Sequence, residues 1–396
     1  MARRAGMPGV REIAAAAGVS PSLVGYRFGS MDGLRQTVLA RAHDQEASRW
    51  RERMRVFLCG AVSRDDLAGL LNELLLSESW PDDRLAALRW LRMLRRVRSE
   101  GDVHGIFPES EGLFWAELSE RLALPMGADR TLAAFFHGLA FGQLIGAREM
   151  GFQAWSSTLV ERFTRRLLGH PIPGGAADSA WRQIAADHTD GMADQNRIQH
   201  PTRQAILDAA VRILVEDGTS GLTHRRLAAA AGVSVSSVIH FFETRRTILR
   251  EAYSLLNARV RDRALVLFDD PQSSPGALTA SELARRLTPV DQIAGRANQL
   301  ELAGLLNAMF EASRDSETRQ IGLSLFARSG ETSRRLLRRL RGFEEGGSWL
   351  DAQIFRLTSN GLMMLSLQGQ AAEAATEYPV RPDELADTLS LLFGKP

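Results

Sequence analysis

The strongest structural signal in the chain lies at Thr223–Phe242, THRRLAAAAGVSVSSVIHFF, which reads as two short helices joined by a tight turn. Thr223 is a favourable N-cap for a helix over Arg225–Ala231. Gly232 supplies the left-handed backbone that ends this helix, because glycine adopts it at no steric cost. A second helix follows over Val235–Phe241. The pattern predicts a helix-turn-helix, whose second helix enters the major groove of DNA.

The two predicted helices have an apolar inner side and a polar outer side. Leu227, Ala231, Val238 and Phe242 are spaced to meet inside the corner, which leaves the outer face of the second helix for base edges and phosphates. Arginines beside the motif are candidates for phosphate contacts. The predicted DNA contacts here are Thr223, Arg225, Arg226, Ser234, Val235, Ser236, Ser237, Ile239, His240, Arg245 and Arg246.

The same stretch occurs a second time near the start of the chain. Arg11–Phe28, REIAAAAGVSPSLVGYRF, matches Arg225–Phe242 at 11 of 18 positions, with Gly18 aligned to Gly232. A repeated unit of this kind indicates a tandem architecture. The candidate DNA contacts in this copy are Arg11, Ser20, Pro21, Ser22, Gly25, Tyr26 and Arg27.

Both stretches resemble the DNA-binding segment of tetracycline-repressor-type (TetR) regulators. Upstream of the second copy, PTRQAILDAAVRILVEDGTSGLT is similar to the first helix of that family. The resemblance implies an all-α chain in which each DNA-binding head precedes a helical effector domain. In that family the last two helices of each subunit form a four-helix dimer interface. We therefore expect the two units of this chain to pair as an intramolecular pseudo-dimer, with a homodimer as the alternative.

The first copy departs from the family pattern. Only nine residues precede Val10, too few for the family's first helix, so either the true start lies upstream or this head is degenerate. Ile13, Ala17 and Val24 are expected to be partly exposed. The family usually has an aromatic residue or histidine where Gly25 and Ile239 stand, and a lysine where Met31 and Arg245 stand. These departures keep open an alternative function, a helical ligand- or partner-binding protein whose heads no longer bind DNA.

The chain divides into five predicted segments. They are a truncated helix-turn-helix (1–45), a helical effector or dimerisation domain (46–170), a linker rich in Pro, Gly, Asp and Gln (171–200), a second helix-turn-helix (201–250) and a second helical domain (251–396). Within these segments, single helices are expected over Met54–Trp80 and from a cap at Thr202. Gly361 in a late helix corresponds to Gly138, and LLFG at the end corresponds to LLG at 167–169.

Composition excludes several classes of function. The 396 residues carry a net charge of +2 and one cysteine, Cys59, which we expect to be a small core residue. The histidines have no zinc spacing and no catalytic motif is present, so no metal, cofactor or enzymatic activity is predicted. The longest apolar stretch, Leu132–Ala147, is shorter than the ~20 residues of a membrane span. A cytoplasmic location is therefore expected.

Aromatic residues in the first half suggest a pocket for a small apolar ligand. The candidate ligand-binding residues are Trp90, Trp115, Phe136, His137 and Phe141, with ordinary core packing as the alternative role for each of them. Together these features predict a ligand-responsive transcriptional repressor. It would read a double-stranded DNA operator with the second head, alone or together with the first.

Overall fold

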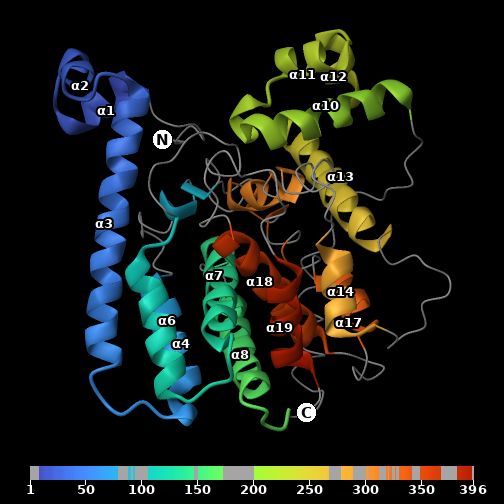
Figure 1. Ribbon diagram of the computed structural model, residues 1–396. Helices are drawn as coiled ribbons and strands as arrows, with labels where there is room; N and C mark the ends of the chain where they lie inside the picture. The colour runs from blue at the N-terminus through green and yellow to red at the C-terminus, as the bar shows by residue number, and fades with distance from the viewer. Residues whose placement is uncertain are drawn as a thin grey trace.

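The protein is all-α, as predicted (Figure 1). The computed structural model describes residues 9–78, 106–146, 150–172, 200–266, 278–288, 330–340, 348–366 and 381–394, and short pieces within 88–93 and 300–326. In this part of the chain the only extended pairing is an isolated bridge between Leu278 and Leu340. The predicted linker lies almost wholly outside the described residues. No helix among the described residues is long and apolar enough to cross a membrane.

The first half of the chain begins with the first helix-turn-helix, α1 (Val10–Ala17) and α2 (Pro21–Phe28). The long helix α3 (Met31–Phe57) connects this head to the body. The body contains the 3-10 turn η1 (Arg64–Asp66), α4 (Leu67–Glu78), α6 (Glu109–Arg121), α7 (Ala128–Gly146) and α8 (Met150–Leu167).

The second half also has a helix-turn-helix head, a long connecting helix and a helical body. Its head comprises α10 (Pro201–Asp217), the 3-10 turn η2 (Thr219–Gly221), α11 (His224–Ala231) and α12 (Val235–Phe241), and α13 (Arg245–Val266) connects it to the body. The body contains α14 (Ala280–Leu287), α17 (Gly330–Leu337), α18 (Trp349–Ser366) and α19 (Pro382–Phe393).

Three local predictions are wrong. The helix expected over Met54–Trp80 is divided, because α3 ends at Phe57 and a loop with Gly60 precedes η1 and α4. Cys59 lies in this loop and is exposed rather than buried in the core. The cap of α10 is His200, whose Nδ1 accepts a hydrogen bond from the amide of Thr202 at 3.3 Å, with proline in the first turn.

Helices α7 and α8 of the first half pack against α18 and α19 of the second half in the centre of the molecule (Figure 1). The closest approach is at two glycines. A Cβ on Gly138 would overlap the backbone of Leu357, and a Cβ on Gly361 would overlap the backbone of Ala134. Both Gly138–Gly361 and Ala134–Leu357 are 223 residues apart, so the two contacts are reciprocal, as at a two-fold interface.

The two heads lie at the same end of the molecule and are attached differently (Figure 1). The second head shares one continuous hydrophobic core with the body, through buried residues such as Leu227, Val238 and Phe242. The first head has a small core of its own, Ala14, Val24 and Leu34, separate from the main one. Its position therefore depends on α3, which carries it away from the body.

Candidate DNA-binding interface

The second head has the predicted helix-turn-helix geometry. Thr223 caps α11 by accepting a hydrogen bond from the amide of Arg226 at 3.3 Å. Gly232 has a left-handed backbone at φ +68°, and Ser234 caps α12 by accepting from the amide of Ser237 at 3.0 Å. Leu227, Val238 and Phe242 are fully buried and Ala231 is half-buried, so the expected inner face is confirmed.

Helix α10 and the start of α13 support this corner. Arg203 on α10 lies over the ring of Phe242, 5.2 Å from its centroid, and forms an ion pair with Glu251 of α13. Arg212, also on α10, donates to the carbonyl of Ala230 at the end of α11 at 3.1 Å. The orientation of α12 is therefore fixed from behind by packing and by polar contacts.

The outer face of α12 is open to solvent. Val235 is 42% exposed and Ile239 51% exposed, Ser236 and His240 are exposed, and Ser237 is half-buried. The ring of His240 stands edge-on to Phe241, with the centroids 5.1 Å apart. A short helix with small hydroxyls, a branched apolar residue and an imidazole on its free side is chemically suited to contact base edges.

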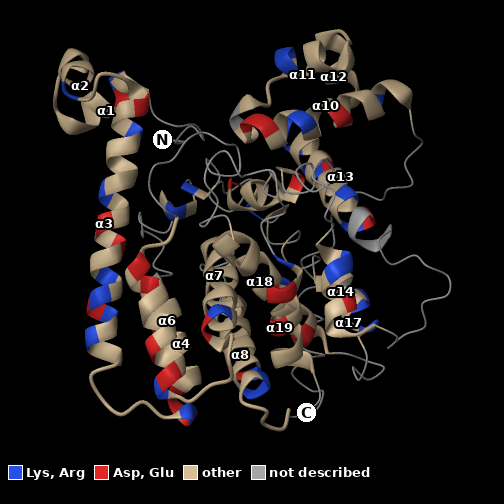
Figure 2. Cartoon of the chain, in the orientation of Figure 1, with Lys and Arg blue, Asp and Glu red and all other residues tan. Residues whose placement is uncertain are grey.

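Two of the predicted phosphate-binding arginines have partners within the protein. Arg226 forms an ion pair with Asp217, the last residue of α10, and Arg245 donates to the carbonyl of Thr219 at 2.7 Å. Arg225 is exposed and makes no ion pair among the described residues, and Arg246 is exposed as well. Figure 2 shows basic residues (blue) at the start of α11 and residues other than Lys, Arg, Asp and Glu (tan) along α12. Arg225 and Arg246 are therefore the two predicted arginines whose side chains are open to a phosphate.

The first head has the same turn with weaker support. Gly18 is left-handed at φ +66°, and Ser20 caps α2 by accepting from the amide of Leu23 at 3.2 Å. Tyr26 is 88% exposed. The other candidate contacts, Arg11, Ser20, Pro21, Ser22, Gly25 and Arg27, are also exposed. Among the residues expected to be partly uncovered, Ile13 is half-buried and Ala17 exposed, whereas Val24 is buried.

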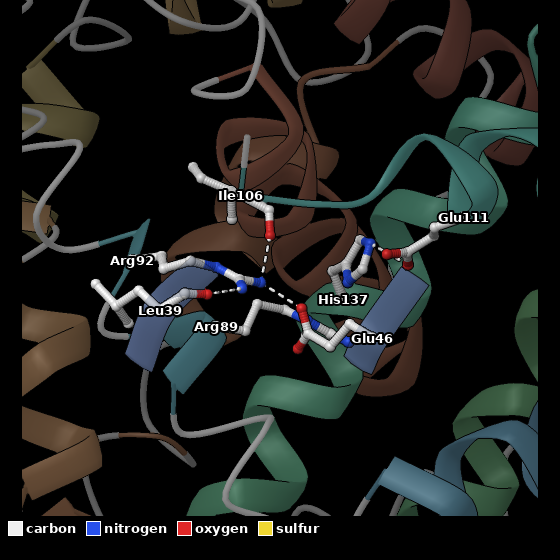
Figure 3. A network of polar contacts seen from close by, with 7 residues as sticks. All are labelled: Leu39, Glu46, Arg89, Arg92, Ile106, Glu111 and His137. Carbon is white, nitrogen blue, oxygen red and sulfur yellow. Dashed lines mark hydrogen bonds and ion pairs between the residues drawn. The ribbon is translucent and has the colours of Figure 1, made fainter. Parts of the chain in front are cut away.

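A buried polar network ties α3 to the body of the first half (Figure 3). Glu46 of α3 is 1% exposed and accepts a hydrogen bond from Arg89 at 3.1 Å. It also forms an ion pair with Arg92, which donates to the carbonyls of Leu39 at 3.4 Å and Ile106 at 2.8 Å. Buried charges need such partners, because removing one leaves the others uncompensated.

A cavity of about 40 Å³ lies beside this network. Three of the five predicted ligand residues line it, namely Trp90, His137 and Phe141, together with Arg89, Met93, Ile106, Phe107, Ala140, Leu144 and Met364. Trp90 and Phe141 are stacked with their ring centroids 4.3 Å apart. The Nε2 atom of His137 lies 2.9 Å from a carboxylate oxygen of Glu111 (Figure 3). Met364 comes from α18, so both halves of the chain form the wall.

The other two candidate ligand residues lie outside this cavity. Trp115 and Phe136 are buried in an aromatic core, with ring centroids 5.2 Å apart. Both also contact Trp50 of α3, at 5.7 Å and 5.8 Å. In this structure they fill the interior of the first body and do not face an open site.

The comparisons with known proteins concern the second head. Residues 206–252 match the family model described as "Bacterial regulatory proteins, tetR family". This stretch is a TetR-family helix-turn-helix domain. The chain is also 30% identical over 129 residues to the HTH-type transcriptional regulator BetI of Rhizobium meliloti (strain 1021). That match covers 32% of this chain and 59% of the relative's length. Both similarities are to transcriptional regulators rather than to enzymes, in agreement with the predicted lack of catalytic activity.

Sequence reasoning missed the residues that attach the TetR-type head to the body. The carboxylate of Glu311 accepts a hydrogen bond from the amide of Thr219 at 2.7 Å, between α10 and α11. Phe310, the neighbouring residue, contacts Trp90 of the cavity wall, with ring centroids 5.9 Å apart. No local motif marks such residues, because their partners lie far away in the chain. Their only signal is a charged residue within an otherwise apolar helical stretch.

Proposed function

We propose that the protein is a DNA-binding transcriptional regulator that reads its operator through α12. The observation that carries this proposal is the exposed face of Val235, Ser236, Ile239 and His240, held on a TetR-type head whose inner face is buried and capped. Such a helix fits the major groove, and the small side chains at its start allow close approach to the bases.

The test is binding of the purified chain to the DNA upstream of its own gene, measured at two salt concentrations. Ser236→Ala combined with His240→Ala should abolish specific binding, because both side chains lie on the reading face. Ser157→Ala, an exposed serine on α8, is the matched control and should bind as the wild type does. Equal binding by the double variant and the control would exclude α12 as the reading helix.

We propose further that the two halves act as an intramolecular pseudo-dimer on an asymmetric operator. The reciprocal contacts at Gly138 and Gly361 support this pairing, and both heads lie at the same end of the molecule (Figure 1). Because the residues of α2 and α12 differ, the two half-sites should differ in sequence and lie about 34–36 Å apart. A footprint with a perfect palindrome would favour a homodimer that uses only the second head.

We propose that a small, largely apolar ligand controls DNA binding from the cavity at Trp90. At about 40 Å³ the cavity holds little more than one water, so a ligand can enter only by displacing a wall residue. Arg89 in that wall bonds Glu46 on the helix that carries the first head. Trp90 contacts Phe310, beside the residue that anchors the second head. Displacing Arg89 or Trp90 removes a contact that holds one of the heads in place. The ligand would then bind more tightly to the state with a displaced head than to the DNA-bound state, and this difference in affinity is what release of DNA requires.

A second function has support for the first head alone. Tyr26 (88% exposed), Leu23 (48%) and Val19 (37%) give it an apolar surface that suits a protein partner as well as DNA. The two roles separate in the binding assay above. If Tyr26→Ala leaves DNA affinity and footprint unchanged, the first head does not read DNA.

A further inference from the structure

Asp351, at the start of α18, is held by two arginines of α8 from the other half of the chain. Arg162 donates to both carboxylate oxygens at 2.9 Å, and Arg166 donates to them at 3.0 Å and 2.7 Å. The side chain of Asp351 is 2% exposed. Arg162 and Arg166 are four residues apart, so they lie one above the other on the same face of α8. We call these three residues the Asp351 triad.

The internal repeat identifies which residues would replace this triad in any other pairing of the halves. Helix α18 corresponds to α7 with an offset of 223, and the matching ends of α8 and α19 (Leu167–Leu168 and Leu391–Leu392) give an offset of 224. With these offsets, the residue of α7 that is equivalent to Asp351 of α18 is Ala128. The positions of Arg162 and Arg166 in α8 are occupied in α19 by Ala386 and Ser390.

The opposite end of the pseudo-symmetric interface has the reverse arrangement of charge. There the cation is on the central helix and the anion on the outer one, since Arg130 of α7 pairs with Glu384 of α19 at 2.9 Å. Thr131 and Thr388 share a hydrogen bond of 3.2 Å beside this pair. Glu384 also pairs with Arg381 of its own half at 2.7 Å, whereas both arginines that hold the carboxylate of Asp351 belong to the other half.

Pairing of like halves would break these contacts. Two copies of the second half would place the buried Asp351 opposite Ala386 and Ser390, neither of which carries a positive charge. Two copies of the first half would place Arg162 and Arg166 opposite Ala128, with Asp129 as the nearest acid in sequence. Leaving a buried charge without its partner is strongly unfavourable, so pairing of like halves is disfavoured. The cost is larger for two second halves, because Asp351 is buried and would face no positive charge.

We propose that the Asp351 triad specifies the partner at this interface, pairing the second half with the first half and excluding the same half of another copy. The chain then closes on itself, because two halves tethered in one chain meet at a high effective concentration. This inference rests on the pairing proposed above and is independent of DNA recognition.

The test uses three full-length variants and measures their mass and their compactness, as the sedimentation coefficient, by sedimentation velocity. Asp351→Arg places three arginines together, and Arg162→Asp with Arg166→Asp places three acids together. Each should open the interface and lose the compact single-chain form near 43.6 kDa. Mixing the two variants should give a one-to-one complex of twice the chain mass, because each half finds its complement in the other chain. Combining all three substitutions in one chain should restore the compact monomer.

The combined variant also shows whether loss of the monomer reflects pairing or general misfolding. A control reversal at an exposed pair, Glu52→Arg beside Arg55, should leave the mass unchanged. The inference is overturned if Asp351→Arg remains a compact monomer. It is also overturned if the combined variant forms no more compact monomer than the two variants from which it is built. Unchanged DNA binding by the α12 double variant at normal mass would instead contradict the proposed function and leave the triad intact.

Discussion

Gly138 of α7 and Leu357 of α18 approach so closely that the glycine has no room for a side chain. The same holds for Gly361 against Ala134, at the positions exchanged by the internal repeat. Glycine in a helix interior normally costs about 1 kcal/mol relative to alanine. At these two sites that cost is offset because the helix backbones come into direct contact.

Gly138→Ala and Gly361→Ala should each destabilise the protein by about 1–3 kcal/mol, because the added methyl group meets backbone that cannot rotate away. Urea denaturation of both variants measures this effect. Gly69→Ala in α4 is the matched control, since a Cβ there meets open space. It should be neutral or stabilising by about 0.5–1 kcal/mol. If all three glycine variants behave alike, the contact between α7 and α18 is not as close as described.

The Asp351 triad also predicts a dependence of stability on pH. Burial by itself raises the pKa of Asp351, but the hydrogen bonds and positive charges of Arg162 and Arg166 outweigh it, and the net pKa lies below its usual 3.8. A carboxyl with a lowered folded-state pKa stabilises the fold above its unfolded pKa and loses this contribution as the pH falls through the folded value. Asp351→Asn should therefore cost about 3 kcal/mol at pH 7.

That difference between Asp351→Asn and wild type should shrink as the pH falls below about 4, because the unfolded chain then binds a proton at this carboxyl whereas the folded protein binds one only at lower pH. Denaturation measured in steps from pH 7 to pH 3 tests this. Glu52→Gln, at a fully exposed carboxylate, is the control and should show no comparable loss at pH 7. A constant difference across the range would mean that the charge of Asp351 does not contribute to stability.

The sequence predicts the heads well because their determinants are local. Ser234, Gly232 and Thr223 each act within three residues of their own position, so spacing alone is informative. The small residues at Gly138 and Gly361 likewise indicate close helix contact. Their partners cannot be derived this way, because helical periodicity shows which face is buried and not which helix covers it.

The internal supports of the heads escape prediction for the same reason. Glu46 lies in a strongly charged stretch of α3, where a solvated side chain is the ordinary expectation, yet it is 1% exposed. Its partners Arg89 and Arg92 are 43 and 46 residues away. Cys59 shows the opposite error, since its apolar character suggests burial although the end of α3 places it in a loop.

Arg225 should contribute to DNA binding through a phosphate. Replacing it with alanine should weaken binding to all sequences alike and reduce the magnitude of the log–log salt slope by about 0.9, the value for one phosphate contact. Arg55→Ala, an exposed arginine at the far end of α3, is the control and should leave the slope unchanged. An unchanged slope for Arg225→Ala as well would remove this residue from the interface.

Glu46→Gln should loosen the first head without affecting the second. The substitution keeps the shape of the side chain but removes the charge that compensates Arg89 and Arg92, which costs about 3 kcal/mol or more in a buried network. Hydrogen exchange should show faster exchange of amides in α3, with those of α10–α12 unchanged. Faster exchange in both heads would indicate that this network supports the whole molecule and not α3 alone.

Trp90 and Glu311 should be energetically coupled in DNA binding, although they do not touch. Trp90 contacts Phe310, whose neighbour Glu311 holds the amide of Thr219 at the entrance to the second head. We expect displacement of Trp90 by a ligand to act on the second head through residues 304–311, which contain Phe310 and Glu311. Removing the Glu311 carboxylate would then break the connection between the cavity and the head. Trp90→Ala and Glu311→Ala should then give a double variant whose DNA affinity departs from the sum of the single effects by at least about 0.5 kcal/mol.

Glu117→Ala, on the exposed side of α6, should combine additively with Trp90→Ala. Additivity in both cycles would exclude segment 304–311 as the connection between cavity and head, because residues that share no two-state element do not influence each other's energy.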